Sequence, residues 1–170
     1  MKKIFLGALC LLLCLGVSAK APVKIACVGN SITYGYTIEN RERDSYPAQL
    51  QRMLGEGYVV GNFGKSGATL LNKGHRPYMK QEEFQKALAF AGDIVVIHLG
   101  INDTDPRNWP DYRDFFVRDY LALIDSFRVV NPDVRILVAR MTPISDRHPR
   151  FESGRYNKPL RPLQDTPMYS

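Results

Sequence analysis

The feature that most constrains the fold of this chain is a repeated alternation of short apolar stretches with longer amphipathic ones. Four apolar, partly β-branched stretches predict buried strands, at residues 23–28, 58–63, 93–99 and 135–141. Between them, apolar residues at helical spacing predict helices that begin at Pro47 and that span 82–91 and 112–130. Strands that alternate with helices in this way build a parallel sheet with helices on both faces.

The predicted helices each have one apolar face. The residues assigned to these faces are Leu50, Met53 and Leu54 in the first helix, Phe84, Ala87, Leu88 and Ala91 in the second, and Phe116, Tyr120, Leu123, Ile124 and Phe127 in the third. These residues are the expected core of the helical layers.

Short polar turns follow the predicted strands, at residues 29–31, 64–67, 100–103 and 142–143. Open parallel sheets bind their ligands beyond the carboxyl ends of the strands. We therefore expect a functional site where these turns meet.

The first of these turns contains Ser31. Gly29 permits a sharp turn that would hold the Ser31 hydroxyl at the edge of the sheet. Acyl transfer needs such an exposed oxygen and a nearby backbone N–H for the oxyanion. Taken alone, a serine at this position is more often a turn residue or a helix cap. Thr33 also stands where a Gly-x-Ser-x-Gly elbow has its last glycine.

The next two turns offer hydrogen-bond donors. A free backbone N–H at Gly67 would be able to point at a ligand, and the Asn102 side-chain amide would be able to donate to a developing oxyanion. The alternatives are a flexible turn at Gly67 and an Asx-turn cap at Asn102.

Together the three turns resemble, in their order and in their residues, the first three sequence blocks of the SGNH (GDSL-type) ester hydrolases. The resemblance runs from Val23 to Pro143 and implies that Ser31 is the nucleophile. It also implies an oxyanion hole formed by Ser31, Gly67 and Asn102, the last within a Gly-x-Asn-Asp motif. Asn30 is a departure, because many members have aspartate there.

The resemblance further implies a flavodoxin-like three-layer α/β/α sandwich and ester hydrolysis without a metal or another cofactor. Residues 102–109 look most like carbohydrate O-acetylesterases related to sialate O-acetylesterases. The expected substrate is therefore a small acyl ester or an O-acetylated carbohydrate.

The catalytic histidine of the family is missing from this chain. The family supplies it in a late Asp-x-x-His motif, but none of the three histidines present, His75, His98 and His148, sits in such a motif. A serine without a base is a poor nucleophile, so low or no activity is expected. His148, in Asp146-Arg147-His148, is the candidate for a substitute base.

The last residues carry no strand or helix pattern. Residues 151–170 contain Pro159, Pro162 and Pro167 with basic residues between them. We interpret the fold as C-terminally incomplete, with the fifth strand and last helix missing through truncation or a frameshift. The predicted division is a signal peptide at 1–19, a partial SGNH domain at 20–152 and an irregular or disordered tail at 153–170.

The first 19 residues predict export. Lys2 and Lys3 precede an apolar run over 4–15, and Val17-Ser18-Ala19 offers small residues for cleavage. The run is shorter than a membrane span, so a secreted or periplasmic protein without a stable membrane anchor is expected. Cleavage would leave Cys27 as the single cysteine, which excludes an internal disulfide.

Two other function classes fit less well. The net charge of +6 is spread without a basic stripe, which argues against nucleic acid, and no Gly-x-Gly-x-x-Gly or Walker loop follows the first strand. A non-catalytic carbohydrate-binding module remains the alternative function, with Trp109, Tyr112 and Tyr34 as sugar-stacking candidates. The same aromatics are more often core or rim residues.

Overall fold

Strands and helices alternate through residues 20–109 and 111–141, which are the part of the chain that the computed structural model describes. The strands are β1 (Val23–Gly29), β2 (Tyr58–Gly64), β3 (Ile94–His98) and β4 (Arg135–Val138). The α-helices are α1 (Ser31–Tyr34), α2 (Arg41–Asp44), α3 (Tyr46–Leu54), α4 (Glu82–Phe90) and α5 (Phe116–Val130). Short 3₁₀ turns are η1 (Tyr78–Lys80), η2 (Ile101–Thr104) and η3 (Arg113–Phe115). All four predicted strands and all three predicted helices are present.

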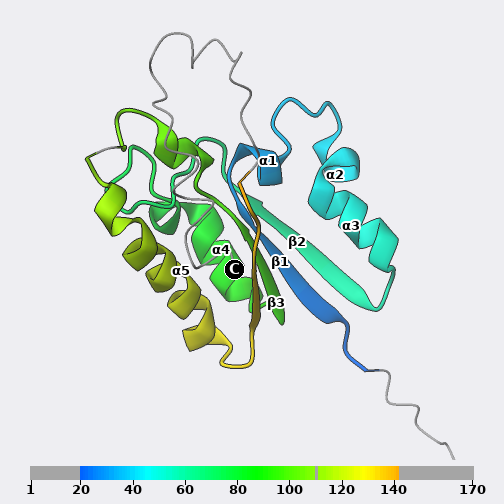
Figure 1. The fold of residues 1–170 in the computed structure, drawn as a ribbon. Helices are drawn as coiled ribbons and strands as arrows, with labels where there is room; N and C mark the ends of the chain where they lie inside the picture. Colours follow the sequence, from blue (N-terminus) through cyan, green and yellow to red (C-terminus); the bar gives the residue numbers. More distant parts are fainter. Residues whose placement is uncertain (1–19, 110, 142–170) are drawn as a thin grey trace, which may run out of the picture.

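The sheet is parallel, in the order β2-β1-β3-β4 (Figure 1). The chain runs from β1 outward to β2 and then returns to place β3 on the other side of β1. The order of strands therefore reverses between β1 and β3, which is the switch point where sheets of this kind bind their ligands. The predicted α/β class with a parallel sheet is confirmed.

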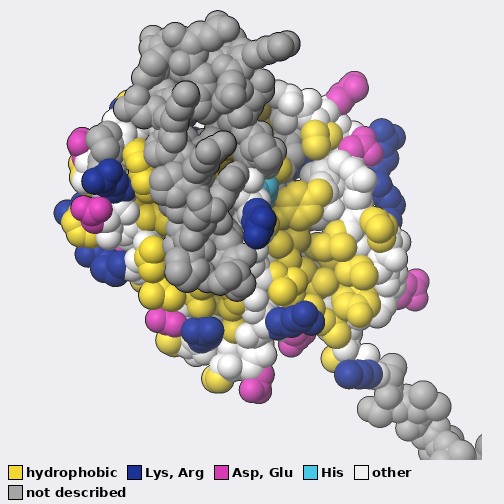
Figure 2. Space-filling model, in the orientation of Figure 1, with side chains coloured by type: hydrophobic (Ala, Val, Ile, Leu, Met, Phe, Trp, Pro, Cys, Tyr) yellow, Lys and Arg dark blue, Asp and Glu magenta, His cyan; other side chains and the backbone are white. Residues whose placement is uncertain are grey.

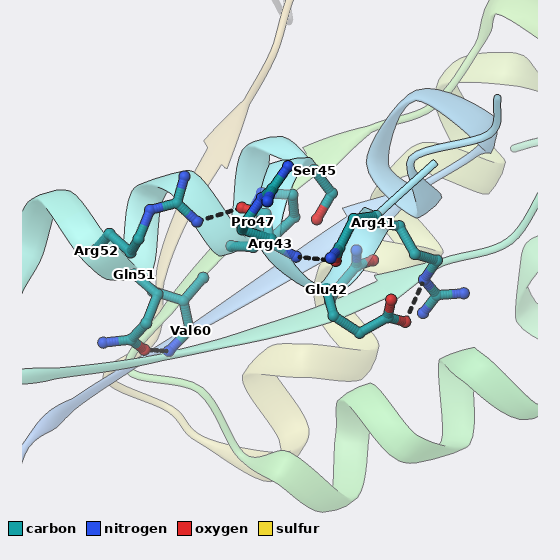
Figure 3. Close-up of a pocket in the computed structure, with 11 residues that line it drawn as sticks. Arg41, Glu42, Arg43, Ser45, Pro47, Gln51, Arg52 and Val60 are labelled. Atoms are coloured by element: carbon teal, nitrogen blue, oxygen red, sulfur yellow. Dashed lines mark hydrogen bonds and ion pairs between the residues drawn. The ribbon is translucent and has the colours of Figure 1, made fainter. Parts of the chain in front are cut away.

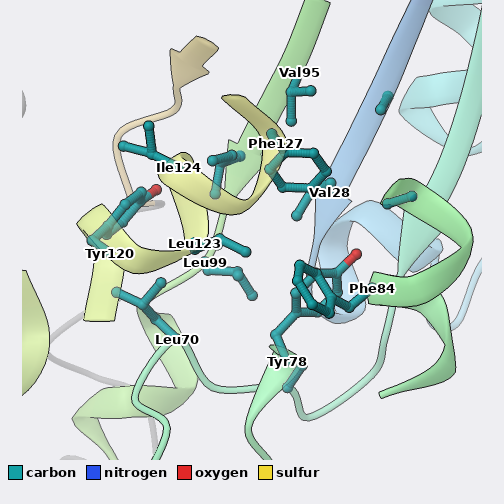
Figure 4. Close-up of a cluster of buried hydrophobic side chains, with 14 of the residues drawn as sticks. Val28, Leu70, Tyr78, Phe84, Val95, Leu99, Tyr120, Leu123, Ile124 and Phe127 are labelled. Atoms are coloured by element: carbon teal, nitrogen blue, oxygen red, sulfur yellow. The ribbon is translucent and has the colours of Figure 1, made fainter. Parts of the chain in front are cut away.

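The main core lies between the sheet and helices α4 and α5 (Figure 4). Val28 and Val95 of the sheet belong to it, together with Phe84 from α4 and with Leu123 and Phe127 from α5. The rings of Phe84 and Phe127 meet edge to face, with centroids 6.1 Å apart. The residues predicted for the face of α5 are all buried, so the helical period of the sequence identifies this layer correctly.

Helix α3 covers β2 on the opposite side of the sheet, which completes three layers (Figure 1). The prediction that Met53 faces the core is wrong, because its side chain is 82% exposed. Pro47, Leu50, Gln51 and Leu54 are among the buried or half-buried positions of α3. They follow the i, i+3, i+4, i+7 pattern of one helix face, and Gln51 is a polar residue on this otherwise apolar face.

Gln51 faces inward because it closes the edge of the sheet. Its Oε1 accepts a hydrogen bond from the N–H of Val60 (2.7 Å), and its Nε2 donates to the carbonyl of Tyr58 (3.0 Å). This amide occupies groups of the edge strand β2 that would otherwise be open to another strand.

On the sheet face that α3 covers at β2, the side chains of β3 and β4 are more exposed to solvent. Leu137 of β4 is 41% exposed and pairs with the half-buried Val96 of β3. Figure 2 shows hydrophobic side chains gathered over the region where Figure 1 draws β1, β2 and α3.

The predicted signal peptide, the tail and His148 lie outside the described residues, as does any strand or helix after β4. Within residues 20–109 and 111–141, no helix is both long and apolar enough to cross a bilayer.

Candidate active site

The carboxyl ends of three strands meet at Gly29. This last residue of β1 pairs with Gly64, the last residue of β2, and with His98, the last residue of β3. The turns that begin after these residues therefore start side by side, and they carry Ser31, Gly67 and Asn102. The register thus brings together three of the four predicted polar turns, and the fourth, at 142–143, lies outside the described residues.

Ser31 is the first residue of α1, and Asn30 alone separates it from the end of β1. The cap of this helix is Asn30, whose Oδ1 accepts a hydrogen bond from the N–H of Ile32 (3.0 Å). Capping therefore does not occupy the Ser31 hydroxyl, which makes the helix-cap alternative for Ser31 wrong.

Two glycines allow α1 to lie against the strands. A Cβ on Gly29 would stand 2.0 Å from Oγ1 of Thr33, and a Cβ on Gly64 would stand 2.1 Å from the backbone nitrogen of Tyr34. No side chain fits at either position. The short helix that begins with Ser31 thus packs against β1 through the Thr33 side chain and against β2 through its backbone.

Gly67 lies in a tight turn connected to β1. The N–H of Lys65 donates to the carbonyl of Gly29 (2.9 Å), and the N–H of Ala68 donates back to the carbonyl of Lys65 (3.0 Å). Gly67 has φ of +77°, a conformation that favours glycine. Its N–H has no acceptor among the described residues, which leaves it available to a ligand.

Asn102, in the η2 turn, is hydrogen-bonded to the Gly67 turn. Its Nδ2 donates to the carbonyl of Ala68 (2.8 Å), and its own carbonyl accepts from Nδ2 of Asn108 (2.9 Å). An amide nitrogen carries two hydrogens, so one bond fixes the side chain while the second hydrogen remains for a ligand.

Asp103 is a site residue whose role the sequence reasoning missed. Its carboxylate is fully buried and accepts the N–H groups of Leu70 (2.9 Å) and Leu71 (2.7 Å). Burial raises the pKa of this carboxyl to about 7. Asp103 and Asn102 together attach the third turn to the second. The signal was the last position of the Gly-x-Asn-Asp motif, which places a carboxylate directly after the amide.

Asn108 is a second residue that was missed. It is buried, and its Oδ1 accepts the backbone N–H of His75 (2.9 Å). Its other amide atom donates to Asn102, as described above, so Asn108 connects the His75 loop with the oxyanion candidate. Its place six residues after Asn102 carries no sequence signal of this role.

The described histidines are not arranged as a general base. His75 is exposed, and its Nδ1 lies 3.3 Å from Oδ1 of the Asn108 amide. His98, at the end of β3, is half-buried, and burial lowers the pKa of its imidazole. Within the described ranges no histidine forms an ion pair with a carboxylate, and no group of three or more His, Cys, Asp or Glu side chains gathers to hold a metal.

The aromatic side chains considered for sugar stacking make internal contacts. Trp109 meets Phe116 edge to face at 6.1 Å and, like Tyr112, packs against the main core. The guanidinium of Arg41 lies 4.0 Å from the ring centre of Tyr34. These contacts favour the interpretation of the three aromatics as core and rim residues.

A cavity of about 550 Å³ lies between β2 and helices α2 and α3 (Figure 3). Its arginines have partners: Arg41 lies 3.1 Å from Glu42, Arg43 pairs with Asp44 at 2.7 Å, and Arg52 donates to the carbonyl of Arg43. Ser31, Gly67 and Asn102 do not line this cavity.

A sequence profile of the GDSL-like lipase/acylhydrolase family matches residues 27–165. The chain belongs to this family. The resemblance to the SGNH (GDSL-type) hydrolases is thereby confirmed.

One curated relative is an acetylxylan esterase of Xylanibacter ruminicola (strain ATCC 19189 / DSM 19721 / CIP 105475 / JCM 8958 / 23). It is 50% identical over 106 residues, which are 62% of this chain and 22% of that protein. The chain thus spans about a fifth of the length of the relative it matches.

Solved structures share the fold. A GDSL-like lipase from Parabacteroides merdae ATCC 43184 has a TM-score of 0.53 and 23% identity over 85% of this chain and 74% of its own. A family two carbohydrate esterase from Clostridium thermocellum, in complex with cellohexaose, has a TM-score of 0.53 and 23% identity over 86% and 53%. These neighbours support the three-layer α/β fold.

Proposed function

We propose that Ser31, Gly67 and Asn102 form the nucleophile and oxyanion side of an esterase that removes acetyl or other small acyl groups from carbohydrates. The observation that carries this proposal is the hydrogen-bonded connection of their three turns at the switch point of the sheet. Family membership and the 50% identity with an acetylxylan esterase support the acetyl ester as substrate.

In the proposed reaction the Ser31 hydroxyl oxygen attacks the acyl carbonyl carbon. The carbonyl oxygen gains negative charge, and the N–H groups of Ser31 and Gly67 and the free hydrogen of the Asn102 amide stabilise it. The bond between the carbonyl carbon and the sugar oxygen then breaks, and the sugar oxygen takes the proton that Ser31 loses. Water hydrolyses the acyl-serine ester, which releases the carboxylic acid and returns a proton to Ser31. Neutral N–H donors supply the charge stabilisation in this scheme, which calls for no metal or other cofactor.

In this scheme, removal of the proton from the Ser31 hydroxyl is the step that limits the rate. The 170 residues contain no Asp-x-x-His motif, and neither described histidine is held by a carboxylate. We therefore propose low or no turnover for these residues, because loss of the base in a serine triad costs several orders of magnitude. His148 remains the candidate for a substitute base and lies outside the described residues.

Hydrolysis of nitrophenyl acetate by the purified chain tests the proposal. We expect a slow release of nitrophenol that Ser31→Ala abolishes and Asn102→Ala lowers, while the control Ser126→Ala on α5 leaves the rate unchanged. Equal rates in the wild type and Ser31→Ala would contradict the nucleophile. A fast wild-type rate that His148→Ala abolishes would show that His148 acts as the base.

Export to the periplasm or the medium is proposed on the composition of residues 1–19. Amino-terminal sequencing of the protein from these fractions would show a start after Ala19.

The carbohydrate-binding module is the weaker candidate because Trp109 and Tyr34 have internal partners. Saturable binding of xylan fragments with no hydrolysis of acetylated xylan would favour it instead.

A further inference from the structure

Arg76 contacts the peptide group between Ser66 and Gly67. Its Nη1 donates a hydrogen bond to the carbonyl of Ser66 (2.9 Å). A Cβ placed on Gly67 would stand 3.4 Å from the same nitrogen, so the guanidinium lies directly against this turn. The backbone of Arg76 is held in place as well, because its carbonyl accepts the N–H of Thr69 (2.8 Å).

The turn over residues 65–68 is one whose central peptide has two orientations. The Ala68 N–H bonds to the Lys65 carbonyl (3.0 Å), and Gly67 at the third position has φ of +77°. Since Ser66 does not share the positive φ, this combination is that of a type II turn. A type I turn keeps the same closing hydrogen bond but rotates the central peptide, here Ser66–Gly67, so that its carbonyl and N–H exchange sides. The surroundings of this peptide therefore decide where the Gly67 N–H points.

The Ser66 carbonyl and the Gly67 N–H belong to one planar trans peptide and point in opposite directions. A charged donor that holds the carbonyl thus fixes the direction of the N–H on the other side. The positive charge on the carbonyl also polarises the peptide, which makes its N–H a stronger donor. Within the described residues Arg76 forms no ion pair, so the Ser66 carbonyl is its principal partner.

We propose that Arg76 is a positioning residue for the oxyanion hole. It selects the type II orientation of the Ser66–Gly67 peptide and strengthens the Gly67 N–H as a donor to the oxyanion. The part concerning the oxyanion rests on the function proposed above, whereas the part concerning the turn does not.

Nuclear Overhauser effects in the full chain test the turn. In a type II turn the extended ψ of the second residue brings Hα of Ser66 close to the amide hydrogen of Gly67, and in a type I turn the two amide hydrogens approach instead. We expect Arg76→Gln to weaken the first effect, strengthen the second and move the Gly67 amide proton upfield. Arg76→Lys, which retains a charged donor, should largely preserve the wild-type pattern.

The matched control is Arg128→Gln, which removes another exposed arginine that pairs with Asp125 on α5 and does not contact the turn. It should leave both effects unchanged. Arg76→Gln with the wild-type pattern and an unmoved Gly67 resonance would overturn the proposal.

Kinetics test the role of the oriented N–H. On nitrophenyl acetate, Arg76→Gln should lower kcat by about 10- to 100-fold with KM unchanged, which is less than the roughly 100- to 1,000-fold loss from removing an oxyanion donor outright. A reoriented turn with unchanged kcat would refute the oxyanion role. Wild-type hydrolysis that Ser31→Ala does not lower would refute the proposed function and leave the turn result standing.

Discussion

Asp103 should make the protein less stable as the pH rises, and Asp103→Asn should remove this dependence. Burial raises the pKa of Asp103 from 3.8 to about 7 in the folded protein. Between these values the folded state keeps a proton that the unfolded chain has lost. The stability is therefore fully present below pH 3.8 and declines as the pH rises through about 7. A difference of about 3 pH units corresponds to about 4 kcal/mol of unfolding free energy.

Urea denaturation at pH 4.5 and pH 7.5 measures the effect. The unfolded carboxyl is already partly ionised at pH 4.5, so about 3 kcal/mol of the change falls between the two conditions. Asp103→Asn has no titrating group at this position and should lack this part of the difference. The contribution of His98, whose pKa is lowered by burial, is common to both proteins and cancels in the comparison.

Asp105 supplies the control. Arg107 lowers the pKa of Asp105 to about 2, so this carboxyl is ionised in the folded protein at both test conditions, and it is already mostly ionised in the unfolded chain at pH 4.5. Asp105→Asn should therefore keep the wild-type difference between pH 4.5 and 7.5. If Asp103→Asn keeps it too, the buried carboxylate is not the cause and the reasoning fails.

Three further predictions concern the scaffold. Leu123→Ala on α5 should lower the unfolding free energy by about 3 kcal/mol in urea denaturation because this side chain is fully buried, whereas the 47% exposed Leu121 should tolerate alanine within about 0.5 kcal/mol. Gly64→Ala should cost more than about 3 kcal/mol or prevent soluble expression, because its Cβ would strike backbone, while Gly57→Ala meets open space and should leave the melting temperature nearly unchanged. Gln51→Ala should increase the concentration-dependent association measured by light scattering, because it opens the edge of β2.

The layers of the fold were predictable because they rest on periodicity. The face of α5 follows from apolar residues at helical spacing, and β1 and β3 follow from apolar runs that end in glycine or polar turns. Met53 shows the limit of this reasoning. Its position on α3 is apolar in the sequence, but the edge of β2 required an amide on the inward face, and Gln51 fills that role.

The site was predictable as a set of turns but not as a network. Ser31, Gly67 and Asn102 each follow a predicted strand, and the register of a parallel sheet brings such positions together. Asp103 and Arg76 hold these turns through hydrogen bonds to backbone groups. Asp103 accepts N–H groups from a loop more than 30 residues earlier in the chain, and Arg76 donates to a carbonyl within its own loop. Bonds from side chain to backbone leave no pattern in the partner's sequence, so only coordinates reveal them.

The contact of α1 with bare backbone has a consequence for how such a protein can change its substrate. Gly29 and Gly64 carry no side chain of their own, so the serine-bearing helix lies directly on the strands. The exposed segment over 37–40, which follows this helix, can then be lengthened, recharged or grafted while Ser31 keeps its position. Chemistry and selectivity are in this way separable properties of the scaffold, and libraries randomised in that segment are a route to new ester specificities.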